Sequence, residues 1–222
     1  MASPLPIEIY SDVVCPWCYL GKRRLEAALG ARPSLTVELR FRAFELNPEL
    51  PVEGVDRAQY LAQKFGDPSR LREAHERLEA LGRDVGIEFR FAAARRMPNT
   101  RRAHALAQLA GERQADMIDA LFRAYFEDGQ DIGDPEVLVE LGRAAGLDAA
   151  AVREGLSSPA TLAAIAVEER TAAELGIHGV PFFVFAGHWA VSGAQEPATL
   201  VAVLDRVVAG LAARTSSSTA AP

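Results

Sequence analysis

The order in which hydrophobic periodicity changes along the chain is the feature that most restricts its fold. Residues 7–10 and 35–44 read as strands around a helix, the second because apolar and polar residues alternate. Helical spacing then dominates residues 55–177. A strand pattern returns over 180–192 as a hairpin, before a helix expected over 197–211. This order predicts an α/β chain with a long helical segment inside it.

Two cysteines, Cys15 and Cys18, lie where the first strand meets its helix, and they are the only cysteines in the chain. If Cys15 caps this helix, Pro16 falls at the first helical position, where its fixed φ suits the helix. The free N–H groups of Trp17 and Cys18 and the helix dipole would then stabilise a negative charge on the Cys15 sulfur. We therefore expect Cys15 to attack as a thiolate and Cys18 to resolve the mixed disulfide.

Residues that can cap helix N-termini recur along the helical segment. Side chains that can cap a helix precede the apolar periodic runs at Asp56, Asp67, Asn99 or Thr100, Asp134, Asp148 and Ser158. A short extended piece is expected over residues 87–91, between two of these helices. The segment is otherwise predicted to be all helical.

Composition and charge exclude several function classes. The net charge of −6 and pI of about 5.3 disfavour nucleic acid and acidic membranes as partners. No run of about 18 apolar residues predicts a membrane span, and residues 1–7 lack the features of a secretory signal. We therefore expect a cytoplasmic protein, in which a CxxC pair is catalytic or binds metal.

Zinc is the main alternative to redox chemistry for the cysteine pair. A tetrahedral zinc site needs two further ligands, and the chain has no second CxxC. The histidines, at positions 75, 104, 178 and 188, also lack the spacing of paired zinc ligands. Redox chemistry is therefore favoured, and no metal site is expected.

Several motifs resemble one known family over nearly the whole chain. They are Ser11-Asp-Val-Val-Cys15-Pro-Trp-Cys18-Tyr-Leu-Gly-Lys22, Pro98-Asn-Thr100 with Ala103-His104, Ala124-Tyr-Phe126 with Asp131-Ile132, Gly176-Ile-His-Gly-Val-Pro181-Phe-Phe-Val, and Val191-Ser-Gly-Ala-Gln195. The sequence resembles the DsbA-like branch of the thioredoxin superfamily, and within it the FrnE-type oxidoreductases. Hydroxychromene-carboxylate isomerases and kappa-class glutathione transferases are related to them.

The resemblance implies a thioredoxin-like fold, βαβ … ββα, with a large all-α insertion. Residues 1–54 and 178–214 would form the discontinuous thioredoxin-like domain and residues 55–177 the insertion. The small, polar residues 215–222 are expected to be a disordered tail.

The resemblance also assigns roles on the far side of the site. Pro181 would be the cis-proline packed beside the cysteine pair, and the backbone at Val180 would pair with an extended substrate. Trp17, between the cysteines, is expected to be partly exposed and to offer substrates an apolar contact.

Four further residues are weaker substrate-binding candidates. Asn99 and Thr100 are most simply helix caps, although the resemblance places their segment over the cleft. His104 is either a packing residue or catalytic, and His178 either exposed at a loop or close to the thiolate. Arginines at 95, 96, 101 and 102 form a solvated surface or an anion site for glutathione or a peptide.

Three functions fit these residues. The first is a thiol–disulfide oxidoreductase or isomerase that acts on protein, peptide or small thiol substrates, with glutathione as a co-substrate and no tightly bound cofactor. The second is a glutathione-dependent isomerase or transferase of small molecules in secondary metabolism. The third is a non-catalytic binder. Related isomerases and transferases generally have serine where Cys15 stands, so the intact pair favours the first.

The two residues between the cysteines influence the reduction potential of the pair. The strong oxidant of the family has Pro-His there, whereas this chain has Pro16-Trp17. An imidazolium charge near the sulfur is thus absent, and we expect a less oxidising pair. The direction of the reaction, the substrate, the electron donor and the choice between monomer and homodimer lie beyond the sequence.

Overall fold

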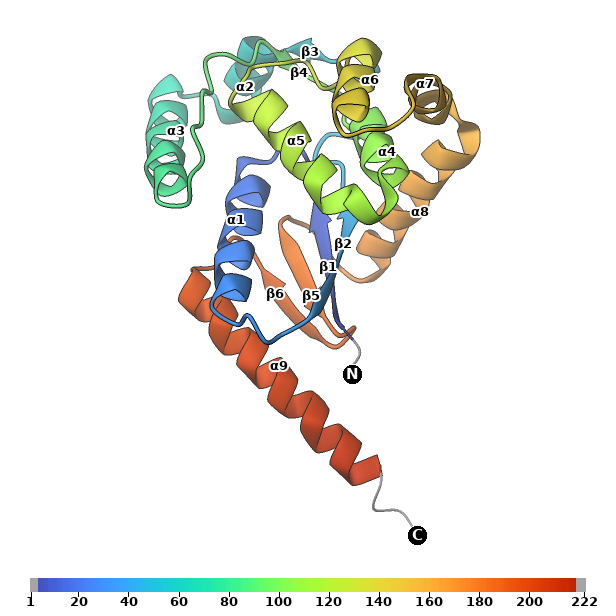
Figure 1. The fold of residues 1–222 in the computed structure, drawn as a ribbon. Coiled ribbons are helices and arrows are strands. Elements are labelled where there is room, and N and C mark those ends of the chain that lie inside the picture. Colours follow the sequence, from blue (N-terminus) through green and yellow to red (C-terminus); the bar gives the residue numbers. More distant parts are fainter. Residues whose placement is uncertain (1–3, 219–222) are drawn as a thin grey trace.

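The protein contains a four-stranded β-sheet with helices packed against it. The computed structural model describes residues 4–218, with side chains through residue 214. The sheet has the order β2-β1-β5-β6 (Figure 1). Its elements, with two flanking helices, are β1 (Leu5–Ser11), α1 (Pro16–Gly30), β2 (Val37–Ala43), β5 (Phe182–Phe185), β6 (Trp189–Ser192) and α9 (Pro197–Ser218).

Pairing within the sheet follows the predicted βαβ and ββα units. β1 runs parallel to β2, with Leu5 opposite Val37, and antiparallel to β5, with Tyr10 opposite Phe182. β5 and β6 form the expected antiparallel hairpin. The chain therefore has the predicted thioredoxin-like α/β fold.

Alternation along β5 explains how the sheet is covered on both faces. Phe183 and Phe185 are fully buried in the main core, which also holds the buried sides of α1 and α9. Phe182 and Val184 face the other way, into a small cluster that includes Ile177. Period-two burial of this kind is what a strand between two packed layers requires.

Seven α-helices connect β2 to β5. They are α2 (Arg57–Phe65), α3 (Pro68–Arg83), α4 (Arg101–Leu109), α5 (Gln114–Phe126), α6 (Pro135–Ala144), α7 (Ala149–Ser157) and α8 (Pro159–Glu174), with a 3₁₀ turn, η1 (Gly111–Arg113), before α5. Five of the predicted caps accept a backbone N–H at a helix start, namely Asp56, Asp67, Asp134, Asp148 and Ser158. Most of these helices lie beyond one end of the sheet, whereas α8 runs down beside β2, where its Glu168 accepts a hydrogen bond from Ala43 N (Figure 1).

The prediction of an extended segment over residues 87–91 is wrong. Residues 87–90 have no regular secondary structure and residue 91 begins a turn, because their apolar side chains pack into an aromatic cluster and no partner strand adjoins them. Phe89 and Phe91 stack with ring centroids 5.0 Å apart, and Phe89 meets Phe126 edge to face. A two-stranded ribbon that the sequence did not predict, β3 (Val55–Asp56) with β4 (Arg96–Met97), lies nearby.

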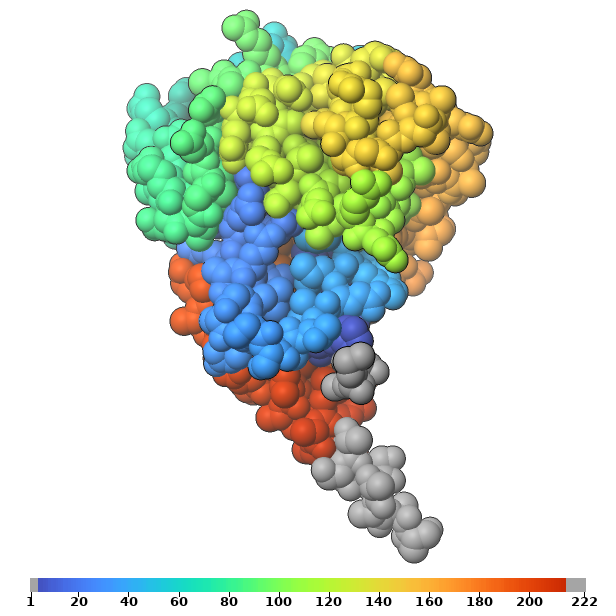
Figure 2. Space-filling model, viewed as in Figure 1, coloured from blue at the N-terminus to red at the C-terminus, as the bar shows by residue number. Residues whose placement is uncertain are grey.

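The C-terminal helix is longer than predicted. α9 continues past residue 211 to Ser218, so the expected tail over residues 215–222 begins within this helix, and residues 219–222 lie outside the described part. The buried residues Leu200, Leu204 and Val207 anchor its first half. The red part of this helix that follows them projects from the body of the molecule (Figure 2).

Candidate active site

Strand register brings the two sequence-distant halves of the site together. β1 ends at Ser11, four residues before Cys15, and β5 begins at Phe182, directly opposite Tyr10. The residue before β5, Pro181, therefore lies at the same sheet edge as the loop that leads to Cys15. The Val180–Pro181 peptide bond is cis, as the resemblance implied.

Cys15 occupies the N-cap of α1 with Pro16 behind it, as the sequence predicts. Its Sγ makes no capping hydrogen bond with the helix and instead donates to the carbonyl oxygen of Val180 at 3.8 Å. The N–H groups of Trp17 and Cys18 therefore make no hydrogen bond to this sulfur in the thiol form, and their stabilisation of the thiolate stays a prediction. The contact joins residues 165 positions apart.

Asp12 shapes the turn that presents Cys15. Its buried carboxylate accepts hydrogen bonds from the N–H groups of Val14 at 3.3 Å and Leu46 at 2.7 Å, and its carbonyl accepts from Cys15 N at 3.0 Å. An aspartate that binds its own backbone two residues on is an Asx turn, which fixes a loop locally. Sequence reasoning did not single out Asp12, although its position two residues before Val14 is such a signal.

The two cysteines have different surroundings. Both are free thiols and both are buried, with 5% of Cys15 and 2% of Cys18 exposed. Burial raises the pKa of the Cys18 thiol well above its usual range, and the hydrogen bond and charge of Cys15 raise it further. Cys18 therefore stays protonated at neutral pH, which leaves Cys15 as the candidate nucleophile.

A cavity of about 370 Å³ opens beside Cys15. Four predicted site residues line it, namely Cys15, Pro16, Trp17 and Val180. Its other walls come from α2, α3 and the end of α5, and include Leu61, Phe65, Leu78 and Phe126. Concave, largely apolar cavities of this volume are typical of small-molecule and side-chain binding sites.

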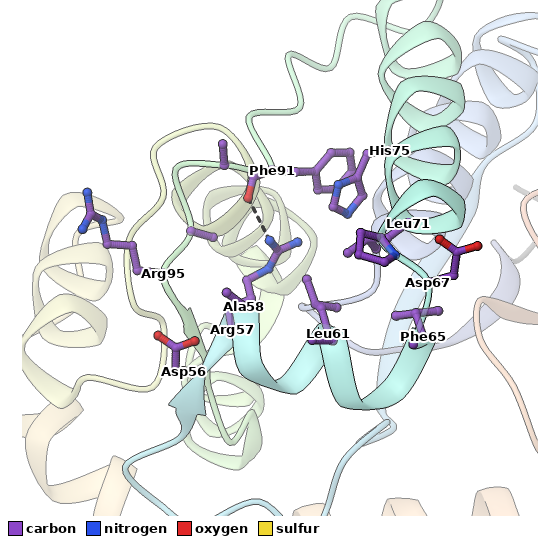
Figure 3. A pocket seen from close by; sticks show the side chains of 15 residues that line it. Asp56, Arg57, Ala58, Leu61, Phe65, Asp67, Leu71, His75, Phe91 and Arg95 are labelled. Carbon is purple, nitrogen blue, oxygen red and sulfur yellow. Dashed lines mark hydrogen bonds between the residues drawn. The ribbon is translucent and has the colours of Figure 1, made fainter.

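A larger cavity of about 550 Å³ is lined by α2, the first half of α3 and the segment around Phe91, and neither cysteine lines it (Figure 3). The two cavities share parts of α2 and α3 as a wall, including Arg57, Leu61 and His75. The candidate nucleophile, Cys15, lines only the smaller of the two cavities. We therefore take the smaller one as the candidate active site.

The other predicted binding residues lie apart from this cavity. Thr100 is the N-cap of α4 without a side-chain hydrogen bond, while Asn99 accepts from Arg101 N at 3.1 Å and donates to Leu50 O at 3.0 Å. His178 is exposed and does not line the cavity. Binding roles for these residues stay predictions.

His104 is deeply buried, with 3% of it exposed. Its Nε2 lies 3.6 Å from Asp12 Oδ1. Burial lowers the pKa of His104, but Asp12, Glu45 and Glu168 outweigh that effect and the net direction is upward. His104 therefore lies next to the carboxylate that shapes the Cys15 turn, and a substrate contact at His104 stays a prediction.

The arginines around residues 95–102 are divided among partners. Arg101 pairs with Glu45 at 2.7 Å and Glu169 at 3.3 Å. Arg96 lies 3.9 Å from Asp131. Two of the four arginines thus lie against carboxylates, and an anion site at this cluster stays a prediction.

Two further observations concern the described part of the chain. Residues 4–218 contain no group of three or more histidine, cysteine or acidic side chains arranged to hold a metal ion. Within the same residues, no helix combines the length and apolar character needed to cross a membrane.

The sequence matches the family of DSBA-like thioredoxin domains over residues 6–205, and the chain belongs to that family. Its class is therefore that of the DsbA-like thiol oxidoreductases.

Solved structures agree with this assignment. A probable DsbA oxidoreductase from Streptomyces coelicolor is 36% identical, with a TM-score of 0.85 over 92% of this chain and 90% of that one. A 2-hydroxychromene-2-carboxylate isomerase shares the fold at 18% identity and a TM-score of 0.71, covering 93% and 98% of the two chains. The cytosolic disulfide reductase DsbM from Pseudomonas aeruginosa, solved with glutathione, shares it at 21% identity and a TM-score of 0.64, covering 92% and 99%.

Proposed function

We propose that this protein is a cytoplasmic thiol–disulfide oxidoreductase that works by dithiol–disulfide exchange through Cys15 and Cys18. The observation that carries the proposal is the contact of Cys15 Sγ with the Val180 carbonyl oxygen, since both residues line the same apolar cavity. The contact supports the two roles that we propose, Cys15 as the nucleophile at a helix N-terminus and the backbone at Val180 as the segment that pairs with an extended substrate.

The exchange proceeds in two displacements. The Cys15 thiolate attacks one sulfur of a substrate disulfide, forms a mixed disulfide and releases the other sulfur as a thiolate. Cys18 then loses its proton, attacks the Cys15 sulfur and releases the second substrate thiolate, which closes the Cys15–Cys18 disulfide. The substrate gains two electrons and the protein loses two, and the reverse sequence oxidises a dithiol substrate.

Glutathione is the co-substrate that we propose for regenerating the pair. DsbM, a fold relative, is solved with glutathione. A glutathione-dependent isomerase or transferase remains the second candidate, and the isomerase with the same fold supports it. The presence of both cysteines favours exchange, because an isomerase that uses glutathione has no need for a resolving thiol.

Trapping the mixed disulfide tests the proposal. With oxidised glutathione, Cys18→Ser is expected to accumulate a glutathione adduct on Cys15, detected by mass spectrometry, because no resolving thiol remains. Cys15→Ser is expected to form no adduct on Cys18, which is buried and protonated. Full disulfide-reducing activity in Cys15→Ser would contradict exchange. Transfer of glutathione to a small electrophilic substrate that persists in Cys18→Ser would instead favour the transferase.

A further inference from the structure

Arg57 is a buried cation at the boundary between the two cavities. It is the first residue of α2, 8% of it is exposed, and it lines both cavities. Its Nη1 donates to the carbonyl oxygen of Phe91 at 2.8 Å (Figure 3), and the guanidinium lies 5.9 Å from the centre of the Phe91 ring. Its Nε is buried and has no hydrogen-bond partner among the described residues.

Comparison with the other buried basic side chains shows what Arg57 lacks. Lys22 pairs with Asp119 at 2.9 Å, and Arg24 pairs with Glu196 at 2.6 Å. Within the described part of the chain no carboxylate pairs with Arg57. A buried charge without a counterion is strongly unfavourable, so an anionic group placed beside Arg57 would be bound favourably.

The cavity beside Cys15 carries no negative charge that could satisfy Arg57. None of the described residues that line it is an aspartate or a glutamate; Asp56 and Asp67 line only the other cavity. Lys64 adds a second cation. Burial and the charge of Arg57 lower the pKa of His75, so this side chain is neutral at pH 7. In a protein of net charge −6, this cavity is locally positive.

The other residues that line the cavity indicate what the uncharged part of a ligand would be. Aromatic rings from several elements line the cavity, including Trp17, Phe65, Phe91 and Phe126. Such rings stack on flat apolar groups. The volume of about 370 Å³ suits a small molecule.

We propose that this cavity binds small aromatic carboxylates, with the carboxylate on Arg57 and the ring between the apolar walls. A disulfide attached to such a ring would meet Cys15, which lines the same cavity. This part rests on the proposed function and names a substrate class for it: aryl disulfides that carry a carboxylate. The exchange balances as before, since two aryl thiols leave as Cys15 and Cys18 become a disulfide.

A pair of aryl disulfides that differ in charge tests the proposal. 5,5′-Dithiobis(2-nitrobenzoate) is anionic, and 4,4′-dithiodipyridine is neutral at pH 7. Reduced full-length protein is mixed with each probe, and the release of aryl thiol is followed by stopped-flow absorbance. Arg57→Leu is expected to slow the anionic probe by about 10- to 100-fold, because it removes a charge-assisted hydrogen bond, and to leave the neutral probe nearly unchanged.

Two further variants serve as controls. Arg143→Leu removes one positive charge from an exposed position on α6, whose side chain is 66% exposed, and is expected to affect neither probe selectively. Arg57→Lys retains the charge without the guanidinium fork, and is expected to keep part of the preference for the anionic probe. It also replaces Arg57→Leu if the latter fails to fold.

The outcomes separate the two proposals. Equal slowing of both probes in the Arg57 variants, or no slowing at all, would overturn the carboxylate site while leaving exchange intact. If wild-type protein reacts with neither probe, exchange itself is refuted. The site is then decided by calorimetric titration of 2-naphthoate against 2-naphthamide, in which only the acid is expected to bind, and only with Arg57 present.

Discussion

Replacing Gly21 by alanine tests whether close packing of α1 on the Val180–Pro181 segment holds the two sides of the site together. A Cβ at residue 21 would lie 2.8 Å from Pro181 Cγ and 3.3 Å from Phe183 Cζ. The proline ring is rigid, so relief requires α1 and this segment to move apart. Because Cys15 precedes α1 and Val180 precedes Pro181, that movement separates the nucleophile from the backbone that would hold a substrate.

The magnitude follows from two opposing terms. Alanine stabilises a helix interior by about 0.5–1 kcal/mol relative to glycine. Overpacking of a well-filled core costs about 1–3 kcal/mol. We therefore expect Gly21→Ala to lower the free energy of unfolding by up to about 2.5 kcal/mol, measured by urea denaturation. Misplacement of this kind is also expected to slow mixed-disulfide formation with a peptide disulfide by roughly 10- to 100-fold.

Gly30→Ala is the matched control at the other end of the same helix. A Cβ at residue 30 meets no atom within 4 Å, so this variant is expected to be neutral or slightly stabilising with unchanged exchange rates. If Gly21→Ala is as stable and as fast as Gly30→Ala, the close packing has no bearing on the site and the reasoning is refuted.

Two further predictions concern buried polar groups. The folded-state pKa of His104 is raised, so its contribution to stability is fully present below about pH 6.5 and is lost as pH rises through the folded-state value. His104→Gln should therefore destabilise the protein more at pH 6 than at pH 9 in urea titrations; a constant difference would contradict the Asp12 pairing. Tyr19 donates to Glu127 at 2.6 Å, and burial raises the pKa of Tyr19. Tyr19→Phe should cost about 1 kcal/mol of unfolding free energy without changing exchange rates, and an unchanged midpoint would show that the bond contributes nothing.

Local signals predicted much of the fold. Helix caps such as Asp56 and Asp134 satisfy N–H groups two or three residues away, so sequence spacing is enough to find them. The hairpin predicted over residues 180–192 also depends on neighbouring residues only. The ribbon between Val55 and Met97 was missed because two-residue strands leave no periodic pattern, and residues 87–91 were misread because long-range aromatic packing replaced strand pairing.

The residues of the candidate site also fall into those predictable from neighbouring residues and those that depend on long-range packing. Cys15, its cap position and Pro16 are adjacent in sequence, and their arrangement follows from helix geometry. The cis bond before Pro181 came from family resemblance alone. Arg57 was not predicted as a site residue, because its place in the cavity wall depends on how α2 packs against α3. Long-range packing of α4 likewise buries His104 next to Asp12.

The reduction potential of the Cys15–Cys18 pair tests the central claim most directly. Equilibration in glutathione redox buffers, with the dithiol fraction read by mass spectrometry after alkylation, gives this potential. A catalytic pair with tryptophan between its cysteines is predicted to fall between about −270 and −120 mV, where substrates and the glutathione pool both exchange with it. A pair that forms no disulfide at any glutathione ratio, or one below about −300 mV as in structural disulfides, would contradict the account.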